Sequence, residues 1–381
     1  MKTPAVLRET LRRKAVAHLF APGGLPRDRA TAPSAATPAP WIYGQVIVLL
    51  LITCFRPLVL AILNVGEMHG VQWAARDVRW VAPVQFAVGA VVFFWLTWLV
   101  IARTPLDQAS QRRRLAHRGA AVACGAAAMY AAVPVSHALQ RQVALTGFSC
   151  TVAWLALEIC RAHGVSPATK VPATASERLG DWKIADATFL ACMAGGGLTT
   201  ILLTVLRWGD IQGLPVMKGS QLSAVGVTDF SFVSLGLGVV VAVVIEDVVI
   251  VAATTALLTA IRRPAWEIYS LICLVEIMLH AYFGLPALGM ALYAVGRVWL
   301  YRRYQRLLPL VAGHAAFDLL GGCIQLAPIL YRPVLIIPFG LTVIWTDRRL
   351  TRAAHPAGQK PVLAEAGLPT TGIPHTRSPV N

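Results

Sequence analysis

Ten apolar runs follow one another along the chain, separated by polar stretches, and this pattern restricts the fold more than any other feature. A helix needs about 20 residues to cross a bilayer, and most of the runs approach that length. Only 14% of the 381 residues are charged, whereas a soluble domain carries roughly 25%. The runs are Trp41–Val65, Trp80–Ala102, Gly119–Leu139, Val143–Cys160, Ile184–Arg207, Phe230–Ile261, Trp266–Gly284, Pro286–Tyr301, Leu307–Leu326 and Pro333–Trp345. The sequence therefore predicts an all-α polytopic bundle of about 8–10 spanning helices, a multi-pass protein of the cell membrane in contact with membrane lipid.

Lysine and arginine are divided unevenly between alternate loops. If the N-terminus is cytoplasmic and all ten runs cross, the inside segments carry 26 of the 34 Lys and Arg residues and the outside segments carry 6. Cytoplasmic loops collect basic residues, so both termini are predicted to be cytoplasmic. The same rule accounts for the net charge of +16. Because the basic residues form no compact domain or binding motif, we expect no nucleic-acid partner.

These patterns divide the chain into four parts. Residues 1–40 form a basic cytoplasmic N-terminal segment, and residues 41–183 hold the first transmembrane helices, whose role the sequence does not indicate. Residues 184–346 hold a second group of transmembrane helices, which carries the chemistry described below. Residues 347–381 are basic and rich in Pro and Gly, a composition that predicts a disordered cytoplasmic tail.

Three smaller features lie inside the apolar runs. Arg56 is followed by Pro57, which predicts a kink with a snorkelling arginine. Arg297 lies one turn before Arg302 and Arg303, so we expect its side chain to reach the cytoplasmic headgroups. The run Gly195–Gly197 predicts close contact between helices.

Ionisable residues inside the apolar runs gather in the second half of the chain. They are the acids Glu246, Asp247, Glu276 and Asp318 and the histidines His280 and His314. Such residues are costly within a membrane and mark functional sites. Glu276 and His280 are four residues apart, as are His314 and Asp318, so each acid shares a helix face with an imidazole. Adjacent helical residues project about 100° apart, so only one of the two neighbouring acids is expected to face a shared cavity.

A carboxylate and two histidines on three helices can form a hydrolytic centre. A desolvated carboxylate can act as a general base towards water, and an imidazole can polarise a carbonyl or bind a metal that does so. His280 and His314 are the residues that would hold such a metal, with Zn²⁺ as the candidate ion. The HExxH spacing of many zinc proteases is absent, so reactions with and without a metal both stay open. A single acid–histidine pair is equally compatible with a structural contact.

Residues 185–345 resemble the CPBP (CaaX protease and bacteriocin-processing) family of intramembrane endopeptidases. That family has a Glu-Glu-x-x-x-Arg motif, then Phe-x-x-x-His, then His-x-x-x-Asn or Asp, each on its own helix. Glu246-Asp247 matches the first motif, His280 the second, and His314 with Asp318 the third. The resemblance implies that residues 184–346 form a catalytic domain that cleaves a membrane-associated protein or peptide. It further implies that Glu246 activates water, that His280 and His314 assist or stabilise the oxyanion, and that Asp318 orients His314.

The chain departs from the family pattern at three positions. The arginine of the first motif falls at Val251, its second glutamate is Asp247, and the Phe of the second motif is Glu276. We expect Asp247 and Glu276 to support the site, with Glu276 restraining His280. Loss of the arginine leaves open a non-proteolytic scaffold or regulator that keeps the fold. A third reading is a proton-coupled transporter that uses the buried acids as a relay, although no paired interrupted helices favour it.

Overall fold

The computed structural model describes residues 39–73, 80–103, 111–130, 138–167, 172–209, 215–217, 232–327 and 331–354. Within these ranges the chain is helical and contains no strand. The helices are α2 (Ala39–Met68), α3 (Val81–Trp98), α4 (Gln111–Tyr130), α5 (Ala138–Ala162), α6 (Ala175–Trp208), α8 (Phe232–Val243), α9 (Thr254–Ala260), α10 (Ala265–Leu279), α11 (Met290–Tyr304), α12 (Leu307–Leu326) and α13 (Arg332–Ala354). Two π-helices, η2 (Leu99–Arg103) and η3 (Val244–Ala253), and two 3₁₀ turns, η4 (Ala281–Phe283) and η5 (Leu285–Gly289), complete the described elements.

Six of the described helices are long and apolar enough to cross a membrane. They are Ala39–Glu67, Val81–Ile101, Leu139–Ala162, Ala175–Trp208, Phe232–Ala260 and Leu307–Gln325. The expected all-α class and the multi-pass character are confirmed. The two runs at 266–284 and 286–301 form α10 and α11, which have only 15 residues each. At 1.5 Å per residue such a helix is about 22 Å long, shorter than the ~30 Å hydrocarbon core.

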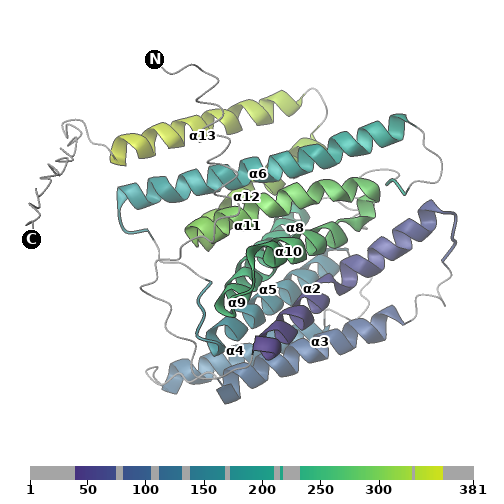
Figure 1. Cartoon of the computed structure of the whole chain (residues 1–381), viewed down its shortest axis with the longest axis vertical. Helices are drawn as coiled ribbons and strands as arrows, with labels where there is room; N and C mark the ends of the chain where they lie inside the picture. Colours follow the sequence, from purple (N-terminus) through teal and green to yellow (C-terminus); the bar gives the residue numbers. More distant parts are fainter. Residues whose placement is uncertain are drawn as a thin grey trace, which may run out of the picture.

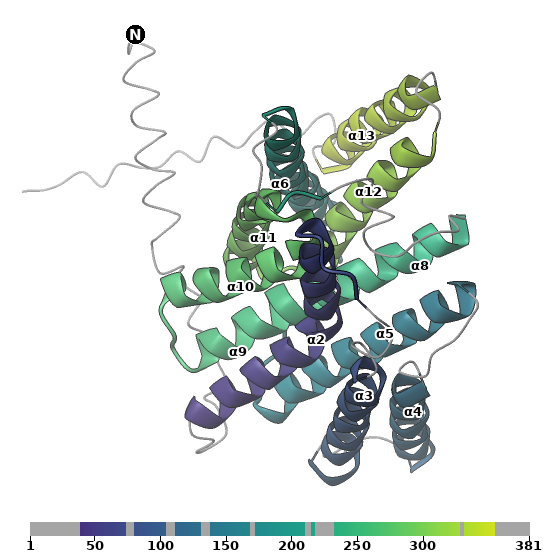
Figure 2. The ribbon, with the colours of Figure 1, turned by 90° about the vertical axis from the view of Figure 1, so that its right-hand side faces the viewer.

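The helices form layers that place the second half of the chain beside one long helix. In Figure 1, α6 runs along α11 and α12, and α13 covers the outer side of α6. The α3–α4 hairpin lies at the opposite end of the molecule, which Figure 2 shows from the side. Helix α5 packs against η3 between these two ends. Charged residues of η3, α10, α11 and α12 lie buried in the interior of the bundle, namely Glu246, Asp247, Glu276, Arg297 and His314.

Two glycines allow α6 to approach the neighbouring helices closely. A Cβ atom on Gly195 would lie 2.4 Å from Cβ of Tyr293 on α11, and one on Gly313 would lie 2.1 Å from the carbonyl oxygen of Ala185. Both distances are shorter than any van der Waals contact. The predicted packing role of the Gly195–Gly197 run is therefore confirmed at its first residue.

The ends of the chain fit the expected division only in part. Residues 1–38, where the basic N-terminal segment was predicted, lie outside the described residues. Helix α13 continues to Ala354, past residue 347 where the tail was expected to begin. The remainder of that tail, residues 355–381, lies outside the described part of the chain.

Candidate functional site

A π-helix presents both acids of the first motif to the same cluster. Residues 232–260 form one continuous helix, and its middle ten residues, Val244–Ala253, adopt the wider π conformation. Glu246 and Asp247 are both buried there, and both contact Arg297 and His314. Both acids therefore reach the same cluster, although only the side chain of Glu246 is partly exposed, whereas that of Asp247 is completely buried. Short π segments are frequent at functional sites.

Arg297 lies at the centre of the cluster and is completely buried. Its Nη1 donates to Oδ1 of Asp247 at 2.8 Å, and its Nη2 lies 3.3 Å from Oε2 of Glu246 and donates to Oε1 of Glu276. The expectation that Arg297 reaches the headgroups was therefore wrong. The attraction between the guanidinium and the carboxylates offsets the cost of removing these groups from water.

Arg297 supplies a cationic partner for Glu246, which the sequence did not locate. Val251, which occupies the motif position, is packed in the apolar core. The guanidinium that holds Glu246 comes instead from α11, 51 positions along the chain from Glu246. The departure at Val251 therefore does not leave Glu246 without a cationic partner.

His314 is held through both of its ring nitrogens. Nδ1 lies 2.9 Å from Oδ2 of Asp247, which fixes this nitrogen as a donor. Nε2 is hydrogen-bonded to the hydroxyl of Tyr293 and lies 3.3 Å from Oδ2 of Asp318. The predicted pairing of His314 with Asp318 across one helical turn is confirmed.

Tyr293 is a site residue that the sequence reasoning missed. Its hydroxyl donates to Oε2 of Glu246 at 3.1 Å, and its ring lies 3.9 Å below the guanidinium carbon of Arg297. Tyr293 and Arg297 are four residues apart on α11, the same spacing that singled out the acid–histidine pairs. That spacing, together with an arginine inside a short apolar run, was the available signal.

His280 lies at the edge of the cluster, at the end of α10. Its ring is 6.2 Å from the ring of Tyr293, and its Nδ1 is hydrogen-bonded to the backbone oxygen of Glu276 at 2.9 Å. The Glu276 carboxylate is 3.9 Å from the same nitrogen and pairs with Arg297 instead. Glu276 therefore orients His280 through its backbone, not through its carboxylate as expected. This arrangement leaves Nε2 of His280 as the nitrogen that faces away from the helix.

Accessibility divides the cluster into a sealed half and an accessible half. The side chains of Asp247, Glu276 and Arg297 are completely buried. Those of Glu246, His280 and Asp318 are 11%, 13% and 25% exposed. The sealed half can hold the geometry, whereas water and a substrate can reach only the accessible half.

The donor atoms do not match a zinc site. Both nitrogens of His314 are engaged by protein groups, which leaves neither lone pair for a metal. The positive charge among the carboxylates is the Arg297 guanidinium. Among the described residues, no three His, Cys, Asp or Glu side chains are grouped as metal ligands. His280 and His314 thus do not form the metal pair that the sequence left open.

Comparison with known proteins adds no relative to this description. No family model matches the chain, and no curated protein or solved structure matches it either. The functional argument therefore depends on the site itself.

Proposed function

We propose that the chain is an intramembrane endopeptidase of the CPBP type, located in the cell membrane with both termini cytoplasmic. Its substrate is a membrane-associated protein or peptide, and the catalytic carboxylate is Glu246. The observation that carries the proposal is the accessible Glu246 carboxylate next to His314 and Tyr293, supported by a sealed ion-pair network.

The reaction follows from the positions of the side chains. Glu246 accepts a proton from a water molecule, and the resulting hydroxide attacks the carbonyl carbon of the scissile amide. Negative charge then develops on the carbonyl oxygen, and the side chain of His280, the histidine of the accessible half, stabilises it. Collapse of the tetrahedral species breaks the C–N bond, and the proton held by Glu246 passes to the leaving amine. The products are a carboxylic acid and an amine, with water consumed.

The other residues of the cluster keep these groups in place. Arg297 holds the Glu246 carboxylate from the buried side, and Tyr293 donates to the same oxygen. Asp247 fixes the orientation of the His314 ring, and Asp318 lies against its second nitrogen. Orienting groups of this kind preorganise a site so that little rearrangement is needed in the transition state.

The test compares protein termini in cells that express the wild-type chain and cells that express Glu246→Gln at equal membrane abundance. We expect new termini with the wild type and their loss with Glu246→Gln. Glu67→Gln is the matched control, because Glu67 is an exposed glutamate at the end of α2 and should behave as the wild type. Termini that are the same in the wild type and Glu246→Gln would refute the proposal. If a cellular effect of the protein then survived in Glu246→Gln, a scaffold role would be favoured.

A further inference from the structure

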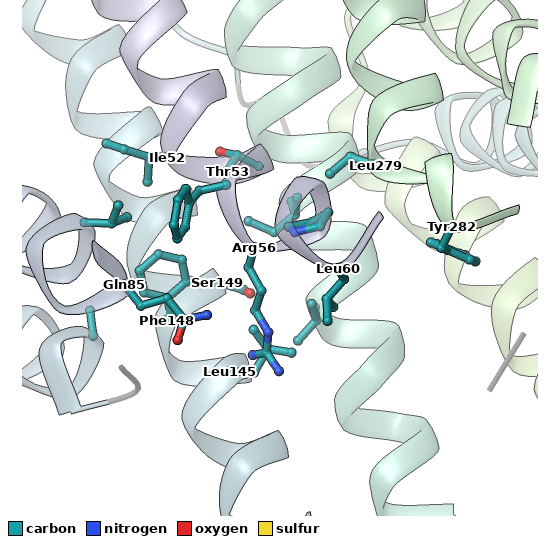
Figure 3. A pocket seen from close by; sticks show the side chains of 16 residues that line it. Ile52, Thr53, Arg56, Leu60, Gln85, Leu145, Phe148, Ser149, Leu279 and Tyr282 are labelled. Atoms are coloured by element: carbon teal, nitrogen blue, oxygen red, sulfur yellow. The ribbon is translucent and has the colours of Figure 1, made fainter. Parts of the chain in front are cut away.

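A cavity that contains one charged residue lies between the first helices and the candidate site. It has a volume of about 230 Å³ and is walled by α2, α3 and α5 on one side and by Ile245, Leu279 and Tyr282 on the other. Most of its lining is aliphatic or aromatic. Arg56 of α2 is the charged residue in this lining, and Figure 3 shows its side chain extending into the space between Ser149 and Leu60.

Arg56 lies deep within a candidate membrane span. It is 17 residues from the start of Ala39–Glu67 and 11 residues from its end. At 1.5 Å per residue, the guanidinium-bearing residue is about 17 Å from the nearer end of the span. Figure 3 shows the side chain extending into the cavity. Its charge is therefore held inside the bundle.

The Arg56 guanidinium has no counter-charge in the described part of the chain. None of the ion pairs or hydrogen bonds between described residues involves it, and the charge that acts on it there is that of Arg141, which has the same sign. Arg297, by contrast, is surrounded by three carboxylates. Ionisable side chains within a membrane normally pair with one another or with backbone carbonyls. An anion in the cavity would supply the missing partner.

We propose that this cavity binds an amphiphile with an anionic headgroup, either a carboxylate or a phosphate, whose headgroup pairs with Arg56. Its aliphatic chain packs against the apolar wall formed by residues such as Phe148, Val241 and Leu279. Arg provides donors that suit both oxyanions. The proposal goes beyond the hydrolytic function and does not depend on it.

The lining favours a lipid-like ligand over a peptide. A peptide backbone brings an N–H and a C=O group per residue, and each needs a partner inside a membrane. The cavity offers few such partners, and the hydroxyl of Thr53 is already engaged by the carbonyl of Leu49 at 2.7 Å. An aliphatic chain brings no such groups. The volume is below the roughly 300–1,000 Å³ of pockets that enclose a drug-sized ligand, so a headgroup and a medium-length chain fit best.

The ligand would lie directly beside the candidate site. Ile245 of the cavity wall precedes Glu246, and the ring of Tyr282 lies 5.8 Å from the ring of His280. The cavity and the site are nevertheless distinct, since none of the six predicted site residues lines the cavity.

The test uses the full chain purified in an uncharged detergent and a diazirine-bearing decanoate as photolabel. Decanoate, decyl phosphate and decanol compete for labelling. We expect the two anions to displace the label and decanol to be at least about tenfold weaker, because a hydrogen bond to a charged group contributes about 1.5–3 kcal/mol. Whichever anion competes better identifies a carboxylate or a phosphate headgroup. The labelled peptides should contain Phe148 or Leu279.

Variants at position 56 distinguish an effect of the lost positive charge on binding from an effect on folding. Arg56→Leu should lose at least about tenfold in affinity for the anions, while Arg56→Lys retains a preference for anions over decanol. Arg352→Leu, which removes an exposed arginine of α13, should bind as the wild type does. Equal labelling of wild type and Arg56→Leu, or equal competition by decanol and decanoate, would overturn the proposal. If Arg56→Leu fails to fold, the headgroup preference of the wild type and the labelled peptides still decide the question.

Discussion

Replacing Arg297 with methionine tests whether the buried network holds this part of the bundle together. Methionine has a similar length and fills most of the space, but it leaves the buried Glu276 without its guanidinium partner and leaves the buried Asp247 with His314 alone. Removing one partner of a buried ion pair destabilises a protein by about 3–5 kcal/mol, because the remaining charge is uncompensated. Since two sealed carboxylates lose the same partner, we expect Arg297→Met to reach at least this range.

A second substitution should restore part of the loss. Glu276→Gln in the Arg297→Met background removes one of the stranded charges, so the double variant should be more stable than Arg297→Met alone. A coupling energy of about 0.5–3 kcal/mol is typical of residues in one network. Arg303→Met is the matched control, because Arg303 lies on the same helix and is exposed.

Unfolding can be followed with a thiol-reactive fluorophore, because Cys54, Cys160 and Cys192 are buried and free. With an unfolding entropy of about 2.1 cal/mol/K per residue, a loss of about 3–5 kcal/mol in a chain of 381 residues corresponds to a fall of about 4–6 °C in the unfolding temperature. Arg303→Met should unfold within about 1 °C of the wild type, since surface substitutions usually cost under ~0.5 kcal/mol. If Arg297→Met unfolds at the same temperature as Arg303→Met and the wild type, the buried guanidinium does not stabilise the fold and the reasoning fails.

Three further results are expected. Gly195→Ala should lower stability by about 1–3 kcal/mol, because its Cβ would overlap Tyr293. The control Gly197→Ala should leave stability unchanged, because its Cβ meets no atom within 4 Å. Equal unfolding temperatures of the two variants would contradict this expectation. Tyr293→Phe removes the hydroxyl that lies between His314 and Glu246. It should slow substrate cleavage about 5- to 150-fold. A wild-type rate of cleavage would show that the hydroxyl has no role. Chelation of zinc should leave cleavage unchanged, because both His314 nitrogens are engaged; a loss of activity that added zinc restores would refute that expectation.

The sequence predicted those parts of the structure that depend on local spacing. Apolar runs of sufficient length gave the helical class, and a spacing of four residues correctly brought His314 and Asp318 together. The same rule placed His280 beside Glu276, although the backbone oxygen of Glu276 is the atom that binds the ring. Both successes follow from the geometry of a single helix, for which sequence separation fixes distance.

The sequence did not predict that Glu246 and Asp247 would contact the same partners, Arg297 and His314. Their expected 100° separation assumes 3.6 residues per turn, and the ten-residue π segment changes that spacing. A π-helix exchanges each i→i−4 hydrogen bond for one to a residue five positions away. Nothing in the apolar composition of Val244–Ala253 distinguishes the two bonding patterns, so the sequence alone did not reveal the segment.

Arg297 was misplaced for a different reason. Its position near the basic residues at the end of α11 matched the pattern of a snorkelling side chain. That pattern considers only neighbouring residues and takes no account of partners that are distant in the sequence. The partners are Asp247 and Glu276, which lie 50 and 21 residues earlier. Glu246, Asp247 and Glu276 all lie within apolar runs of the sequence. Buried carboxylates need a cationic partner, and this requirement was the argument that would have predicted Arg297 as that partner.

The division of the cluster into sealed and accessible halves separates stability from chemistry. Asp247, Glu276 and Arg297 exchange their interactions with water for interactions with one another, so a change in any of them leaves an uncompensated buried group. Glu246 and Asp318 remain partly accessible, so an amide in place of either carboxylate can still be solvated. If the accessible half performs the chemistry, Glu246→Gln should abolish cleavage while it leaves the unfolding temperature near that of the wild type. A Glu246→Gln variant as unstable as Arg297→Met would instead make Glu246 part of the structural network, and the argument for its catalytic role would lose its basis.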